Sequence, residues 1–538
     1  MTARDGATLL ALPPSAIADR PVATLEDLET TLEPDAVWVL GPSREPQACA
    51  RARRTFDAPA FHPPLETDGD GSLRRQVIGN GDLEIAVSAG IRSLRVNPNA
   101  VSSELDDPNS AFAALVCDDV TTTVRPTALE TTLEGADTLA SALPTGRVTT
   151  ALTGSEPAGY EELWHLEAET GAVRAVDHDQ IGGFEPLDEN CVSVRVQGAG
   201  PVEGYNQRQS IASLTLTADG IERVETHKIT NFGLEAVSGI GPKTAERLAE
   251  RGVTTRAELL ETPVQTLADL PNVGQTGART MHQHANVLET GEPRRLTDES
   301  LPGENWHTPP LCIDIETDGL SPTIIWQVGV YDPATDEYRA FVERDAPSDP
   351  GSVLEAFCDW LLGVHPNRAL LTWNGWRFDY RHLGAFIARH VPYYVDEWES
   401  IPKFDLYLWT VGNDNALLPG RTNKLETVSD ALGYDGAGTG LDGAQTAAAY
   451  QRFMRTGDPL EWGRHEDYCE DDCRALWHVY ERLLDAPQAE SDSVSVSNGG
   501  DSSRTGTNDS RVDSTDRTSN PKPSSDANGG EQTGLSDF

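Results

Sequence analysis

Two carboxylates, Asp314 and Glu316, lie in the segment LCIDIETDGL, whose apolar residues predict a buried strand. Residues two apart on a strand point to the same face, about 7 Å apart, so both side chains could share divalent ions. The chain holds 86 Asp and Glu residues, so acid-x-acid pairs also arise by chance. The segments TIIWQVGVYD and EYRAFVER predict two further strands, which makes the pair a candidate metal site on a sheet.

A third carboxylate, Asp379, lies in ALLTWNGWRFDYRHLGAFIARH. The run ALLTW predicts a buried strand, followed by a turn at Asn374-Gly375 and a helix that begins near Asp379. Asp379 would then lie where the strand meets the helix, at the carboxyl edge of the sheet. The alternative is a helix N-cap, a common role for aspartate.

A tyrosine and a fourth carboxylate occur in HEDYCEDDCRALWHVYERLL, whose apolar spacing predicts a helix. Tyr468 and Asp472 are four residues apart and therefore share one face of that helix. Asp471 points about 100° away, and we expect it to face solvent. The alternative is an acidic helix start that complements the helix dipole.

The order of these elements resembles the DEDD exonucleases of the RNase H-like superfamily. Their motifs are Asp-x-Glu, Asn-x-x-x-aromatic-Asp and Tyr-x-x-x-Asp, matched here by Asp314, Glu316, Asn374, Phe378, Asp379, Tyr468 and Asp472. The tyrosine indicates the DEDDy branch, because the other branch has a histidine where this chain has Asp467. The segments KFDLYLW and NKLETVSDALGY look like parts of the proofreading domains of family B DNA polymerases.

This resemblance implies an α/β domain over residues 306–486, with an RNase H-like mixed sheet and flanking helices. It implies 3′–5′ hydrolysis of phosphodiester bonds with two Mg²⁺ or Mn²⁺ ions about 4 Å apart. The expected metal ligands are the oxygens of Asp314, Glu316, Asp379 and Asp472, which suit such hard ions. Tyr468 would orient the attacking water. Asn374 and Phe378 would contact nucleic acid, and Trp376, Phe378 and Leu320 could stack on terminal bases or belong to the core.

The segment LEAVSGIGPKTAERLAERGV predicts a helix, a glycine-rich hairpin and a second helix that begins at Pro242. The segment LADLPNVGQTGARTM repeats it, and residues 231–290 resemble a tandem helix-hairpin-helix domain. In that family, backbone N–H groups hold a phosphate without reading sequence. The close approach would need Gly239, Gly241 and Gly274, and the added charge would come from Lys243, Arg247 and Arg279. Docking to another protein is the alternative.

The other segments carry no chemical motif. Strand-like runs such as AVWVLG and SIASLTLT predict an α/β region over residues 1–230, with either a structural or a substrate-recruiting role. Residues 291–305 form a predicted polar linker. Residues 487–538 are Ser, Asp, Asn, Gly and Thr with almost no large apolar side chain, which predicts a disordered, acidic and polar tail.

The chain of 538 residues has a net charge of −44 and only five lysines, which favours a halophilic, salt-adapted cytoplasmic protein. The rival interpretation is an acidic protein that avoids nucleic acid. Seven scattered cysteines without a CxxC pair suggest small buried side chains in a reducing compartment. We find neither a signal peptide nor an apolar run of 18 residues, which argues against a membrane protein.

The favoured hypothesis is a metal-dependent 3′–5′ exonuclease acting on DNA, with its own helix-hairpin-helix module. The chain after the predicted nuclease domain is too short and too polar to form a polymerase. Two alternatives remain open: an RNA-trimming enzyme of the same branch, and a non-catalytic DNA-binding adaptor. Nothing in the sequence reports on recognition of the 2′-hydroxyl, which distinguishes RNA from DNA.

Overall fold

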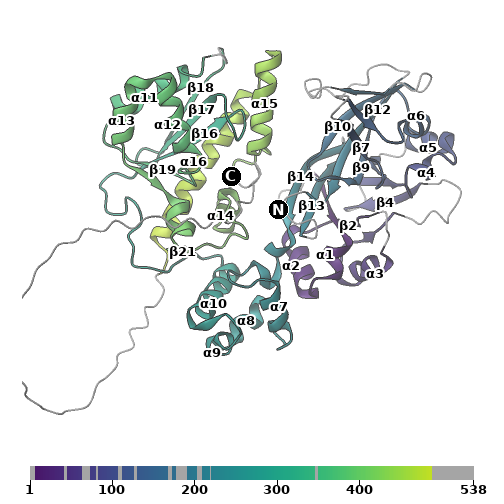
Figure 1. Cartoon of the computed structure of the whole chain (residues 1–538), viewed down its shortest axis with the longest axis horizontal. Helices are drawn as coiled ribbons and strands as arrows, with labels where there is room; N and C mark the ends of the chain where they lie inside the picture. The colour runs from purple at the N-terminus through teal and green to yellow at the C-terminus, as the bar shows by residue number, and fades with distance from the viewer. Residues whose placement is uncertain are drawn as a thin grey trace, which may run out of the picture.

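The computed structural model has an N-terminal part with two sheets, a helical part and a C-terminal part with one sheet (Figure 1). The described residues are 6–41, 45–63, 73–79, 83–106, 112–125, 130–167, 173–176, 191–202, 209–218, 220–345, 349–457 and 459–487. Apart from Pro487, the tail predicted to be disordered lies outside them. None of the helices in these ranges is both long and apolar enough to cross a lipid bilayer.

The first N-terminal sheet has the strand order β14-β13-β1-β2-β3. Its strands are β1 (Ala7–Leu12), β2 (Ala36–Val39), β3 (Ala60–Phe61), β13 (Ser210–Thr217) and β14 (Gly220–Lys228). Helices α1 (Pro14–Ala18), α2 (Val22–Leu32) and α3 (Pro46–Thr55) cover its outer face. Side chains alternate along a strand, so Leu9 in β1 faces the second sheet and Leu10 faces these helices.

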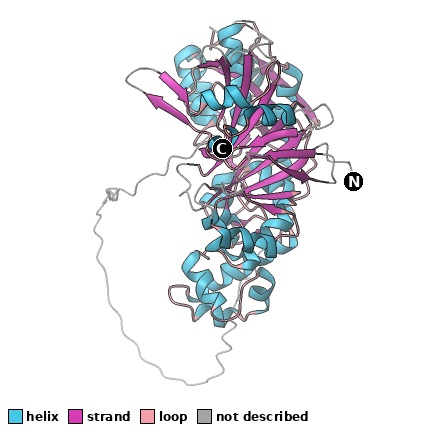
Figure 2. Cartoon of the chain, turned by 90° about the vertical axis from the view of Figure 1, so that its right-hand side faces the viewer, coloured by secondary structure: helices cyan, strands magenta, loops and turns pink. Residues whose placement is uncertain are grey.

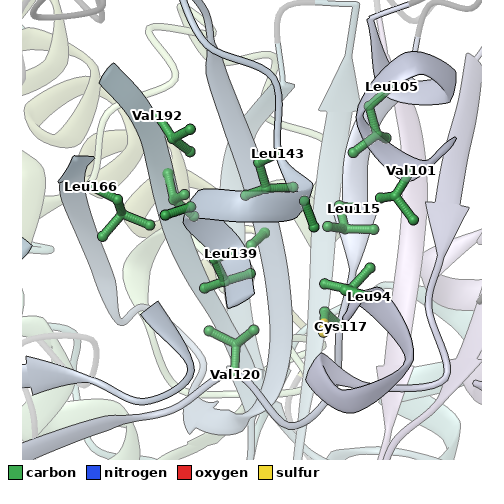
Figure 3. Packing of buried hydrophobic residues seen from close by; sticks show 14 of the residues in the cluster. Leu94, Val101, Leu105, Leu115, Cys117, Val120, Leu139, Leu143, Leu166 and Val192 are labelled. Carbon is green, nitrogen blue, oxygen red and sulfur yellow. The ribbon is translucent and has the colours of Figure 1, made fainter. Parts of the chain in front are cut away.

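The second sheet has the order β11-β10-β12-β9-β6-β5-β4. Its strands are β4 (Arg74–Ile78), β5 (Leu83–Val87), β6 (Phe112–Val116), β9 (Val148–Pro157), β10 (Glu161–Glu167), β11 (Val173–Val176) and β12 (Cys191–Gly200). Its outer face packs against α4 (Ile91–Leu94), α5 (Pro98–Leu105) and α6 (Ala136–Ala142), as Figure 3 shows for Leu94, Val101 and Leu139. A short pair, β7 (Thr122–Arg125) and β8 (Glu130–Leu133), lies outside both sheets. The N-terminal part is therefore a helix-sheet-sheet-helix sandwich, which confirms the predicted α/β class.

The helical part begins with η2 (Ile229–Asn231) and η3 (Gly233–Ala236). Four helices follow: α7 (Pro242–Ala249), α8 (Arg256–Glu261), α9 (Val264–Ala268) and α10 (Gly274–Thr290). Helix α7 begins at Pro242, as predicted, because a first-turn proline has no N–H group that the helix needs. Helix α8 begins with a capping box between Thr255 and Glu258. These helices share one small apolar core.

The C-terminal sheet has the order β18-β17-β16-β19-β20. Its strands are β16 (Leu311–Thr317), β17 (Ile325–Asp332), β18 (Glu337–Val342), β19 (Leu370–Thr372) and β20 (Lys403–Asp405). Strands β16, β19 and β20 are parallel, and β17 and β18 run against their neighbours. One face packs on α11 (Ser352–Val364) and α12 (Asp379–His390), and the other on α14 (Leu425–Ala431) and α16 (Trp462–Leu484). The predicted mixed sheet with flanking helices is confirmed.

The smaller elements of the C-terminal part are η4 (Pro392–Tyr394), α13 (Val395–Ser400), η5 (Leu408–Gly412), β21 (Ala416–Leu417) and α15 (Gly443–Thr456). Strand β21 pairs with β15 (Arg294–Arg295), which lies in the segment predicted to be a linker. Within this segment Arg295 is buried and forms an ion pair with Glu304 at 3.2 Å. The segment is therefore attached to the C-terminal part.

Residues from all three parts of the chain meet at Asp27 in α2. Its carboxylate accepts hydrogen bonds from Arg256 in α8, from Arg421 before α14 and from the backbone N–H of Gly233. Figure 1 shows α2 close to the helical part that contains α7 and α8, and Figure 2 shows the strands gathered in the upper part of the view and helices alone in the lower part. One side chain of the N-terminal part thus contacts both other parts.

Candidate active site

The two carboxylates of β16 face α16, because their neighbours Ile313 and Ile315 face α11 and α12 on the other side of the sheet. Asp314 is half-buried and Glu316 is buried. Opposite Asp314, β17 carries Gly329. A Cβ atom there would lie 2.5 Å from the sulfur of Cys469, so glycine allows α16 to approach the sheet.

Helix α16 brings Tyr468, Cys469 and Asp472 to this face. The Cys469 thiol donates to Asp314 Oδ2 at 3.4 Å. Ligand atoms of Asp314, Glu316 and Cys469 all lie within 4.8 Å of one another. Cys469 is a member of this group that the sequence pattern did not reveal, because its residue type predicted only a small buried side chain. The sequence alone does not show that Cys469 faces the carboxylates, because this depends on how α16 is rotated against the sheet.

Asp379 is buried at the first residue of α12, in the predicted position after the strand. The turn before it is held by Asp405 at the end of β20. This carboxylate accepts backbone N–H bonds from Asn374 (3.0 Å), Trp376 (3.1 Å) and Leu408 (3.0 Å). Asn374 has a φ of 65°, a left-handed conformation that asparagine tolerates better than most residues. Asp405 is thus a supporting residue that no local sequence pattern indicated.

The charges of the four predicted ligands act on one another. Burial, followed by the charge of neighbouring carboxylates, raises the pKa of Asp314 and Glu316 well above the ordinary range. Burial is also the main cause that raises the pKa of Asp379 and of Asp472 to about 7. Within the described ranges, none of the four forms an ion pair with lysine or arginine. Buried like charges without a partner are costly, so the site favours bound cations or protons.

The side chain of Tyr468 lies near Asp472 and favours the charged form of that carboxylate. Burial and the nearby charge of Asp472 raise the pKa of Tyr468 well above its ordinary value. Tyr468 therefore keeps its proton at neutral pH and acts as a hydrogen-bond donor. This pairing follows from the four-residue spacing on α16.

The other predicted residues of this region differ in how far they are exposed to solvent. The side chain of Trp376 is 51% exposed, whereas Phe378 packs against the core under α11 and α12. Leu320 is half-buried. The expectation that Asp471 faces solvent holds only in part, because the residue is half-buried. Its Oδ1 accepts from Tyr434 Oη and from the backbone of Ala437, both at 2.9 Å, because the chain after α14 folds over this side of α16.

The two glycine hairpins of the helical part lie at the surface. Gly239 and Gly274 have φ values of 84° and 66°, which favour glycine. A Cβ atom at Gly241 or Gly274 would meet no other atom within 4 Å, so the backbone there is open to a ligand. Neither α7 nor α10 has a side-chain cap, so their first N–H groups remain available. Lys243 and Arg279 are exposed, while Arg247 is half-buried and donates to the Pro271 carbonyl at 3.3 Å.

Comparison with known protein families identifies both regions. Residues 233–286 match the SAM-like helix-hairpin-helix tandem family, and residues 311–484 match the RNase H superfamily. A comparison with curated proteins finds no match. The chain thus combines helix-hairpin-helix motifs, which are associated with DNA binding, with a domain of the RNase H superfamily, whose nucleases typically use divalent metals.

Proposed function

We propose that this protein is a divalent-metal-dependent 3′–5′ exonuclease that hydrolyses phosphodiester bonds of DNA. One observation carries the proposal. Strand β16 and helices α12 and α16, from three separate segments, place Asp314, Glu316, Asp379 and Asp472 so close that their charges interact. Such a group has little use as a packing element, because it costs stability until cations bind.

The donor set fits hard divalent ions such as Mg²⁺ or Mn²⁺, since all four proposed ligands offer carboxylate oxygens. When bound, these ions would neutralise the phosphate and lower the pKa of a water molecule. Cys469 supports the set by donating its thiol to Asp314, and Asp405 supports it by fixing the turn before Asp379. The thiol is buried and its pKa is raised by burial, so it stays protonated and is a poor ligand for hard ions.

Tyr468 is positioned to orient the attacking water, because its hydroxyl lies beside Asp472 and keeps its proton. Asn374 and Trp376 sit at the carboxyl edge of the sheet, where an incoming strand would pass. The exposed indole of Trp376 offers a stacking surface for a base, whereas Phe378 packs against the apolar core. The 3′–5′ direction and the preference for DNA rest on the motif resemblance.

The hairpins are the proposed second binding site for nucleic acid. Backbone N–H groups at the starts of α7 and α10 would hold phosphates, with Gly239, Gly241 and Gly274 allowing close approach. The net charge of −44 favours a salt-adapted protein, which cannot depend on ion pairing alone. The affinity of simple ion pairing to DNA falls by a factor of about 10³–10⁵ between 50 and 200 mM salt, whereas backbone N–H groups still hold a phosphate. We propose domain limits of 231–290 for this module and 306–486 for the nuclease, with 1–230 as a separate unit.

The test uses 5′-labelled single-stranded DNA and RNA of equal sequence, at high KCl, with Mn²⁺ or with EDTA. We expect a metal-dependent ladder that shortens from the 3′ end, with DNA cut faster. A faster reaction on RNA would make the protein an exoribonuclease. The Asp314→Ala variant is the control for contaminating nucleases. Binding without cleavage of either substrate would overturn the proposal and leave a DNA-binding adaptor.

A further inference from the structure

Helix α14 connects the candidate active site with the N-terminal part. Its apolar face packs on α16, the helix that carries Tyr468 and Asp472. The carbonyl of Asn423, two residues before the helix, accepts a hydrogen bond from Trp373 Nε1 at 3.0 Å, just after β19. The first turn of α14 therefore lies at the carboxyl edge of the sheet, where the four carboxylates also lie.

That first turn carries Glu426, whose side chain is 63% exposed. Its negative charge raises the pKa of both Tyr468 and Asp472, after the larger effect of burial. Glu426 is thus a fifth carboxylate near the site, and it lies on the solvent side. A nucleic-acid strand that reached the four inner carboxylates would meet this additional negative charge.

A cation from the N-terminal part approaches Glu426. Arg223 lies in β14, the outer strand of its sheet among the described strands, and Figure 1 shows β14 beside α14. Its Nη2 atom is 2.8 Å from Glu225 and 3.4 Å from Glu426. The Arg223 side chain is 35% exposed. An exposed ion pair at such a distance contributes about 0–1 kcal/mol, so this guanidinium can exchange Glu426 for another anion.

A second cation lies in the same neighbourhood. Lys424, directly before α14, and Arg223 both lower the pKa of His227, whose value of about 4 is mainly due to burial. At neutral pH His227 is therefore uncharged and does not compete for anions. One cation thus comes from the nuclease side and one from the N-terminal side. Arginine suits a phosphate partner, because its planar fork can make two parallel hydrogen bonds to one phosphate group.

We propose that Arg223 binds a backbone phosphate of the nucleic acid, so that strand β14 of the N-terminal part forms one side of the substrate path to the carboxylate site. The inference rests on the proposed nuclease function, and it gives the N-terminal part a role in substrate binding. Asp27 in α2 binds Arg421, which precedes α14, and thereby links the N-terminal part to the part that carries Glu426. Glu225 and Glu426 share the guanidinium in the free protein, and the arriving phosphate displaces Glu426, the more distant of the two.

The test measures binding of a short fluorescent single-stranded DNA to the full-length protein by anisotropy, with Ca²⁺ replacing the activating metal. We expect Arg223→Ala to weaken binding roughly threefold to tenfold and to reduce the slope of log K against log salt by about 1, as for a lost phosphate contact. Arg223→Lys should restore part of the affinity, and Glu426→Gln should tighten binding. Thermal stability should change little, because an ion pair at this distance on the surface contributes about 0–1 kcal/mol.

The control is Arg75→Ala. Arg75 also lies on an outer strand, β4, and also forms loose pairs with two glutamates, Glu84 at 3.6 Å and Glu104 at 3.4 Å. The Arg75→Ala variant should bind DNA with the same affinity as the wild type. Unchanged affinity and salt slope in Arg223→Ala would overturn the inference, even if the protein proves to be a nuclease. If Arg223→Ala weakens DNA binding but the wild-type protein cleaves neither DNA nor RNA, only the proposed nuclease function would be refuted.

Discussion

Asp27 and Arg421 form a two-pronged ion pair that joins the N-terminal part to the C-terminal part. Arg421 Nη1 donates to Oδ2 at 2.6 Å and Nη2 donates to Oδ1 at 2.9 Å. Arg256 binds both oxygens of the same carboxylate, at 3.0 and 2.7 Å. Side chains with two parallel bonds to a carboxylate have a defined orientation as well as an attraction. This pair therefore connects the C-terminal part to the N-terminal part in a defined geometry.

Replacing Asp27 with asparagine should separate the parts. The variant removes the charged partner of the largely buried Arg421 and leaves Arg256 with Glu289 alone, which costs on the order of 3 kcal/mol. We expect a lower melting temperature and faster proteolysis between the parts, measured by scanning fluorimetry and limited trypsin digestion. Asp19→Asn, at the exposed end of α1, is the control. Equal melting temperatures of the Asp27 variant and the wild type would contradict the proposed role.

The same pair makes the assembly sensitive to acid. Burial alone would raise the pKa of Asp27, but hydrogen bonds from Arg421 and Arg256 outweigh it and hold the pKa well below 3.8. A carboxyl whose native pKa is depressed stabilises the fold above its unfolded pKa, and this contribution is lost as the pH falls through the native pKa. We expect the stability difference between wild type and Asp27→Asn to shrink below about pH 4. A difference that stays constant down to pH 2.5 would refute this assignment.

Replacing Asp314 with asparagine should affect activity and stability in opposite directions. Loss of one metal ligand removes several kcal/mol of transition-state stabilisation, so cleavage should fall at least about a thousandfold. In EDTA at pH 8, however, the variant should melt at a higher temperature, because one of several mutually repelling carboxylates is gone. DNA binding through the hairpins should be retained. A variant that still cleaves would exclude Asp314 from the site.

Metal binding should stabilise the protein more at high pH than at low pH. The pKa values of Asp379 and Asp472 are raised to about 7. The protonated carboxyls therefore stabilise the metal-free fold fully at a pH below their ordinary pKa, and this stabilisation is lost as the pH rises through 7. The increase in melting temperature on adding Mn²⁺ should therefore be larger at pH 8 than at pH 6. Calorimetry in buffers of different ionisation enthalpy should also detect proton release near pH 6. A pH-independent increase would contradict the raised pKa values.

Tyr468→Phe should lower the cleavage rate roughly tenfold to a hundredfold, because a positioned proton donor beside the water is lost. Metal affinity should fall much less, since all four carboxylates remain. Tyr434→Phe is the control, as Tyr434 donates to Asp471 on the outer side of the same helix. Its rate should equal that of the wild type. If both variants lose activity equally, Tyr468 acts only through the packing of α16.

The hairpins should contribute to substrate affinity and not to turnover. Lys243→Ala removes an exposed charge beside the first hairpin, and we expect a KM for long substrates that is raised several-fold, with kcat unchanged. Arg54→Ala, an exposed arginine on α3, should leave both constants unchanged. Deleting residues 231–290 is a poorer test, because it would also remove Arg256 from Asp27. An unchanged KM in Lys243→Ala would exclude a role of this lysine in binding.

Local patterns in the sequence determined several helix starts and which side chains share a face of β16 or α16. The period of two on β16 put Asp314 and Glu316 on one face, and the period of 3.6 on α16 paired Tyr468 with Asp472. Helix starts at Pro242 and Asp379 also follow from local preferences. Such features depend on neighbouring residues alone, so they can be recognised without knowledge of the tertiary fold.

The tertiary structure decided which distant residues meet. Cys469 joins the carboxylates because α16 approaches β16 over Gly329, and Asp405 supports a turn 31 residues before it. Asp27 contacts Arg421 across 394 residues, and no local pattern encodes that pairing. Such contacts depend on how helices rotate against sheets and how parts dock, which is set by the sum of many packing interactions. The placement of Arg223 near the site belongs to this second class.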